Sequence, residues 1–74
     1  MKERIIPKTL LNLISERGLT KTEVAFRAGI DLSRFSRISN GWLVPNENER
    51  ERISSFFELS ENKVFPEFLE TEGN

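Results

Sequence analysis

Cysteine and histidine are both absent from this 74-residue sequence. Without cysteine, the chain can form no disulfide and presents no reactive thiolate. Without histidine, it lacks the side chain that most often acts as a general base or binds a metal ion near neutral pH. The sequence also has no glycine-rich phosphate loop, no metal-ligand spacing and no nucleophile paired with a base. We therefore expect neither an enzyme nor a protein that holds a cofactor or a metal.

Long apolar runs are missing as well. No stretch approaches the roughly 20 apolar residues of a membrane-spanning helix, and the N-terminus lacks the apolar core of a signal peptide. These absences predict a cytoplasmic protein that does not enter a membrane. The length allows a single domain with a small core.

Neither sign of charge dominates the whole chain, because the formal net charge is -1. Residues 1–39 nevertheless carry eight Lys and Arg side chains against four acidic ones, a net charge of +4. Residues 40–74 carry three against eight, a net charge of -5. A surface that faces phosphates needs positive charge, so the first half is the expected place for nucleic-acid binding.

Residues 19–41 have the pattern of two short helices joined by a tight turn. Thr20 and Glu23 stand at the spacing of a capping box, in which each side chain satisfies a free backbone N–H of the other residue. Glycine adopts the left-handed conformation at little cost, so Gly29 is expected to end the first of the two helices.

The second helix of this pair is predicted over residues 32–39. Either Asp31 or Ser33 caps its N-terminus, and Asn40-Gly41 ends it. Its apolar residues, Phe35 and Ile38, are expected to face the core. A buried helix, a glycine corner and a second helix with Ser and Arg on its outer face together predict a helix-turn-helix.

Three further helices are predicted. Pro7 suits the start of a helix over residues 8–17, because the N–H that proline lacks has no partner there. Either Asn46 or Asn48 caps a fourth helix, whose first turns hold the glutamates that a helix N-terminus favours. A short fifth helix ends at Pro66. Since no segment alternates apolar and polar residues, the prediction is an all-α fold of five helices.

The expected organisation is an N-terminal arm over residues 1–6, one domain over residues 7–66 and an acidic, frayed C-terminal tail over residues 67–74. Residues 42–45 form an apolar loop that lies either on the core or on a ligand. Phe68 and Leu69 are apolar residues for which a frayed tail gives no role.

The outward positions of the predicted third helix combine short polar side chains and arginines with one leucine. They are Leu32, Ser33, Arg34, Ser36 and Arg37. A helix that enters the DNA major groove needs such side chains, and the forked guanidinium of arginine matches the O6 and N7 atoms of guanine. The alternative is a solvated face, but such faces usually mix Glu and Lys, and Asp31 is the acid of this one. Leu32 either contacts a thymine methyl group or closes the rim of the core.

Two polar residues near the ends of these helices are candidates for phosphate contacts. Lys21 lies at the start of the predicted second helix, where it either bridges to a phosphate or serves solubility. Asn40 can cap the carbonyl end of the third helix, donate to a phosphate, or do both.

This stretch resembles the phage-repressor and Cro type of helix-turn-helix, the XRE-like regulators. Residues 19–41 match a typical member without a gap, and the resemblance extends over about residues 8–66. The identical positions are Leu19, Glu23, Ala25, Gly29, Ser33, Ser36, Arg37, Ile38, Asn40 and Gly41. The resemblance implies a five-helix fold in which the second and third helices bind DNA. It implies these contact residues: Lys21, Leu32, Ser33, Arg34, Arg37, Asn40 and Leu43.

The chain departs from the family pattern at two pairs of positions. Lys21 and Leu32 stand where many members have glutamines that contact bases, so the sequence preference is expected to differ. Ile14 and Ser39 stand where many members have an Arg–Glu ion pair. Replacing both partners avoids the about 3–5 kcal/mol cost of leaving one charge buried alone, so the fold is expected to persist.

Together these features predict a repressor-like transcriptional regulator that binds double-stranded DNA. Because so small a module makes few contacts, it is expected to bind as a homodimer to two half-sites. The apolar residues left over near the C-terminus, Phe65, Phe68 and Leu69, are the predicted dimer surface. The alternative is an antitoxin-type or protein-interaction module that uses the same fold to bind a partner protein, which an exposed face with Leu11 and Ile14 would favour.

Overall fold

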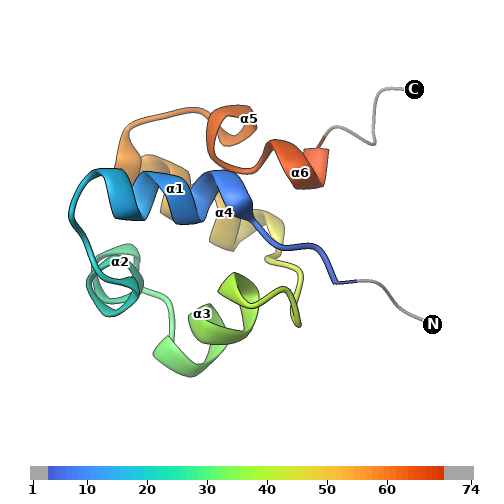
Figure 1. The fold of residues 1–74 in the computed structure, drawn as a ribbon, viewed down its shortest axis with the longest axis horizontal. Helices are drawn as coiled ribbons and strands as arrows, with labels where there is room; N and C mark the ends of the chain where they lie inside the picture. Colours follow the sequence, from blue (N-terminus) through green and yellow to red (C-terminus); the bar gives the residue numbers. More distant parts are fainter. Residues whose placement is uncertain (1–3, 70–74) are drawn as a thin grey trace.

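The computed structural model describes residues 4–69, and these residues form helices joined by short turns and loops, with no strand among them (Figure 1). The predicted all-α class is therefore confirmed. The structure has six helices in this range where the sequence predicted five. They are α1 (Lys8–Glu16), α2 (Lys21–Ala28), α3 (Leu32–Ser39), α4 (Glu47–Phe57), α5 (Glu61–Val64) and α6 (Pro66–Leu69).

The ends of α2 and α3 follow the predicted local signals. The Thr20 side chain accepts from the Glu23 N–H at 3.1 Å, and the Glu23 carboxylate accepts from the Thr20 N–H at 2.9 Å, so the capping box is present. Gly29 ends α2 at a φ of +74°. Of the two candidates for the α3 cap, it is Asp31 whose carboxylate accepts from the Arg34 N–H, at 3.3 Å.

The start of α4 shows a second capping box. The Asn46 side chain accepts from the Glu49 N–H at 2.8 Å, and the Glu49 carboxylate accepts from the Asn46 N–H at 2.9 Å. Asn46, and not Asn48, is therefore the cap. The reciprocal pair satisfies two N–H groups that a helix start leaves without partners.

The C-terminal prediction was wrong at Pro66. This residue begins the short helix α6 instead of ending the chain's helical part, which is physically reasonable because proline fits the first position of a helix. Residues 67–69 are thus not a frayed tail, while residues 70–74 lie outside the described part of the chain. The Glu67 carboxylate accepts from the Thr9 N–H at 2.9 Å and from the Thr9 hydroxyl at 2.8 Å, so it caps the start of α1.

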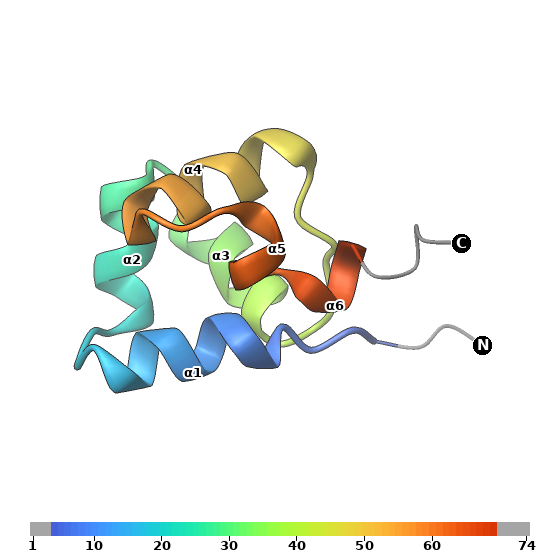
Figure 2. The same cartoon turned by 90° about the horizontal axis from the view of Figure 1, so that it is seen from above.

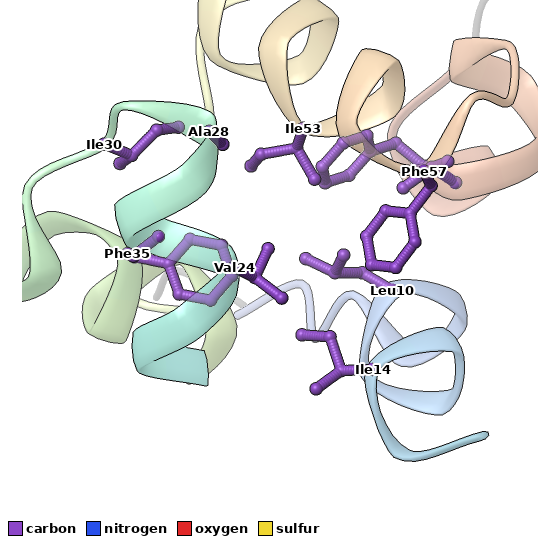
Figure 3. Close-up of a cluster of buried hydrophobic side chains, with 11 residues drawn as sticks. Leu10, Ile14, Val24, Ala28, Ile30, Phe35, Ile53 and Phe57 are labelled. Atoms are coloured by element: carbon purple, nitrogen blue, oxygen red, sulfur yellow. The ribbon is translucent and has the colours of Figure 1, made fainter. Parts of the chain in front are cut away.

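One apolar cluster holds the helices together. The close-up in Figure 3 shows side chains of α1, α2, α3 and α4 pointing toward one another. The fully buried members with the largest side chains come from three different parts of the chain: Phe35, Phe57 and Phe65. Phe68 packs against the cluster and meets the Phe65 ring edge-on, with 5.9 Å between the ring centroids, which explains an apolar residue that a frayed tail did not explain.

The arrangement sets α3 apart from the last two helices. In Figure 1, α2 and α3 lie below α1, and α5 and α6 lie above it; Figure 2 shows α4 across the molecule from α1. The outer face of α3 is therefore remote from α5. None of the helices in the described range is long and apolar enough to cross a membrane.

Candidate functional site

Helix α3 divides into a buried and an exposed face. Phe35, Ile38 and Ser39 are buried, whereas Ser33 and Arg37 are exposed. This division follows the helical spacing of the apolar residues. The exposed face is thus held in place by a well-packed core beneath it, and its side chains are available to a ligand.

A shallow depression of about 260 Å³ lies along this face and the loop that follows α3. It brings together four of the predicted contact residues: Ser33, Arg34, Arg37 and Leu43. Asp31, the cap of α3, also lines it. These side chains come from one helix and its flanking loops, so the depression is a continuous surface with hydroxyl, guanidinium and apolar groups.

The other three predicted contact residues do not line this depression. Lys21 is exposed at the first position of α2. Asn40 is exposed as the residue that follows α3, where its backbone N–H donates to the Ser36 carbonyl at 3.1 Å. Leu32 is 48% exposed and does not belong to the apolar cluster, so it does not close the rim of the core.

Arg37 and Arg34 differ in their partners. Within residues 4–69, no carboxylate forms a salt bridge with Arg37. The Arg34 guanidinium, in contrast, donates to both oxygens of Glu49: its Nε pairs with Oε2, and its Nη2 lies 3.1 Å from Oε1. Such a two-point contact fixes the orientation of both side chains.

Electrostatics follow this geometry. The hydrogen bonds from Arg34 hold the pKa of the Glu49 carboxyl below its ordinary value, and the Asn46 backbone N–H lowers that pKa further against the opposing effect of burial. The same ion pair raises the pKa of Arg34. Glu49 is therefore a carboxylate, and Arg34 a cation, at neutral pH.

The sequence did not predict a role for Glu49 beyond the favourable charge at the start of α4. A signal was present, however, because Glu49, Ile53 and Phe57 are spaced by four residues and so share one face of the helix. All three are buried. A glutamate in line with two core residues indicates a carboxylate that needs a partner.

A second polar contact missed from the sequence supports the turn between α2 and α3. The Nη1 group of Arg52, on α4, donates to the Gly29 carbonyl at 3.1 Å. This hydrogen bond fixes the turn between α2 and α3 to α4. Helix α4 therefore stabilises both this turn and, through Glu49, the first half of α3.

Residues 4–6 of the N-terminal arm and the loop after α3 also meet. The Arg4 guanidinium lies over the Trp42 ring, 4.2 Å from its centroid, a cation–π geometry. Gly41 has a φ of +84°, and a Cβ added to it would lie 2.7 Å from Ile6 Cδ1. The sequence leaves two places for this loop, on the core or on a ligand. Its residues differ in this respect: Trp42 is 67% exposed and does not cover the core, while Pro45 is buried.

Ile14 and Ser39 stand where the family that the sequence resembles often has an ion pair, and both are buried. Ile14 belongs to the apolar cluster, and the Ser39 hydroxyl donates to the Ser36 carbonyl at 3.0 Å. Neither position leaves a buried charge. Since Ile14 is buried and Leu11 is half-buried, α1 does not present the exposed apolar face that would favour the partner-protein alternative.

The predicted dimer surface needs correction at Phe65. This ring is fully buried within the chain, because α5 and α6 fold back toward α1 and carry it into the core. It cannot contact a second copy without unfolding. Phe68 and Leu69 are half-buried and keep some exposed surface.

Within residues 4–69, no three acidic side chains gather where they could hold a metal ion. Comparison of the chain with protein-family models, with curated proteins and with solved structures found no match. The features that bear on function are therefore the surface of α3 and its surroundings.

Proposed function

We propose that this chain is a sequence-specific DNA-binding regulator of transcription, repressor-like and of the phage-repressor and Cro type, in which α2 and α3 act as a helix-turn-helix. The observation that carries the proposal is the exposed face of α3, where Ser33, Arg34 and Arg37 line one depression with Leu43. A major groove about 12 Å wide accepts a helix with such side chains.

The distribution of charge supports this proposal. The half of the chain that contains α3 has a net charge of +4 although the total is -1. Lys21, at the start of α2, and Asn40, after α3, are exposed at the two ends of the unit. Contacts from such positions to phosphates would fix the register of α3 on the duplex.

A regulator of this kind acts where the DNA is, which for a prokaryotic or phage protein is the cytoplasm. It binds as a homodimer to half-sites about 34–36 Å apart, because a single α3 makes few contacts. With Phe65 buried, the surface near the C-terminus that remains for the second copy is around Phe68 and Leu69. Sedimentation of the protein alone and with an operator duplex checks this: a single copy on the duplex would contradict it.

Selection from random duplex DNA, followed by a gel shift, tests the proposal. The expected result is an enriched, near-palindromic sequence that the protein binds at least about 10³-fold more tightly than a scrambled duplex. Failure to enrich any sequence would overturn the proposed function.

Arg37→Ala, measured on the selected duplex, tests the role of α3. Loss of a bidentate base contact is expected to weaken specific binding by about 1–3 kcal/mol. Lys63→Ala is the matched control, since it also removes one exposed cation but from α5, remote from the outer face of α3. Unchanged binding by Arg37→Ala would remove this residue from the site.

A protein-interaction module is the second candidate, and exposed apolar side chains favour it. Phe26 is 83% exposed on α2, and Trp42 and Val44 are exposed in the loop after α3. Binding to a partner protein through these side chains would depend little on salt, whereas binding to DNA would weaken steeply as salt rises.

A further inference from the structure

We infer that Glu49 is a positioning residue for Arg34, and that through Arg34 it determines the base preference of α3 at one position of the DNA site. This inference rests on the proposed function. The observation behind it concerns the two arginines on the outer part of α3. Arg34 pairs with a carboxylate of α4, whereas Arg37 pairs with no carboxylate of residues 4–69.

Glu49 is itself fixed at three points. Its backbone N–H donates to Asn46 Oδ1 at 2.8 Å, and its Oε1 accepts from the Asn46 N–H at 2.9 Å. Both carboxylate oxygens contact Arg34. With 8% of its surface exposed, the residue has little freedom to move. A guanidinium bound to such a carboxylate takes its orientation from α4.

The contact leaves part of the Arg34 guanidinium available. Arginine has five N–H donors, and Glu49 engages one on Nε and one on Nη2. The three donors that remain are on Nη1 and Nη2, the outer end of the group. The Arg34 side chain is still partly exposed and lines the depression with Ser33 and Arg37. Two donors at a fixed outer end are what a bidentate contact to guanine requires.

Glu49 also changes the charge of this surface. Its carboxylate offsets the positive charge of Arg34, so Arg34 attracts phosphates less strongly than a cation without such a partner. A glutamate next to a DNA-facing arginine therefore weakens the sequence-independent attraction to phosphates and fixes the orientation of the guanidinium. A merely structural ion pair between α3 and α4 would have no such effect on base preference.

Glu49→Gln is the variant that separates these roles. Glutamine is accepted at the third position of a capping box, so the start of α4 is expected to remain capped. The variant frees a positive charge and loosens Arg34. We expect it to lose the preference for one base pair in each half-site, to bind scrambled DNA more tightly, and to show a salt slope steeper by about 0.9 for each copy bound.

The matched control is Glu61→Gln. Glu61 lies 3.4 Å from Arg50 Nε in a pair between α5 and α4, so this variant removes a carboxylate from a salt bridge away from the depression. Selection from random duplex DNA is carried out with the unmodified protein and both variants, and salt titrations follow on selected and scrambled duplexes. Glu61→Gln is expected to keep the base preference of the unmodified protein.

A variant Glu49→Gln that is folded by circular dichroism and keeps the same base preference and salt slope would overturn the inference while leaving the proposed function in place. Enrichment of no sequence by the unmodified protein would overturn both.

Should Glu49→Gln unfold, Arg34→Lys decides the matter, because lysine keeps the charge and lacks the fork. It is expected to lose preference at one position with an unchanged salt slope, and full retention of the preference would contradict the inference.

Discussion

The first and second halves of the chain use their charged side chains in different ways. On α2 and α3, Lys21 and Arg37 are exposed, whereas two glutamates of the second half contact the first half: Glu49 binds Arg34, and Glu67 caps α1 at Thr9. A net charge of -1 therefore does not describe the surface that a ligand meets, because some of the acidic charge holds the fold together.

The largest expected effect comes from breaking the core that joins the two halves. Phe57 on α4 is 1% exposed, so Phe57→Ala is expected to lower the free energy of unfolding by about 3–5 kcal/mol. Phe26→Ala, which removes the same ring from the exposed side of α2, is expected to change it by no more than about 0.5 kcal/mol. Urea unfolding followed by circular dichroism measures both, and equal effects would contradict the core described above.

Two glycines with positive φ test the contact between the arm and the loop after α3. Gly18→Ala meets no atom within 4 Å, so it is expected to cost only the roughly 1–2 kcal/mol of a left-handed alanine. Gly41→Ala also crowds Ile6 and is expected to cost about 1 kcal/mol more. Because the chain has one tryptophan, the fluorescence of Trp42 is expected to shift in Gly41→Ala alone. Equal stability losses with no shift would show that the arm does not pack there.

The smallest effect concerns the ion pair between the halves. Since Arg34 lowers the pKa of Glu49 in the folded state, the pair stabilises the fold at neutral pH and loses this contribution as the pH falls below about 5. The unfolding free energy of the unmodified protein is therefore expected to exceed that of Glu49→Gln at pH 7, with a gap that narrows toward pH 3. Glu51→Gln, on the exposed side of α4, is the matched control. A gap that stays constant over this range would argue against the pair.

Local signals made much of the fold predictable. The capping box at Thr20, the left-handed Gly29 and the helical spacing of Phe35 and Ile38 each depend on residues within a few positions of one another. Such interactions are determined by the nearby sequence. The same signals placed Ser33 and Arg37 on one exposed face, as the structure shows.

Contacts between distant residues were not predictable in this way. The hydrogen bonds from Thr9 to Glu67 join residues 58 positions apart, and local signals without these contacts predict a helix end at Pro66. The pairing of Arg34 with Glu49 likewise depends on how α4 packs near the start of α3. The complete burial of Phe65 depends on the path of α5 and α6, and this is why the prediction of Phe65 as part of a dimer surface is wrong.

We propose that the α2–α3 surface binds DNA even though the whole chain has a slight negative charge. The salt dependence of binding to a selected duplex tests it most directly. Each phosphate neutralised by a cation contributes about -0.9 to the slope of log affinity against log salt, so the phosphate contact proposed for Lys21 predicts a slope of about -0.9 or steeper for each copy bound. An affinity that is independent of salt would contradict the proposed binding of DNA by this surface.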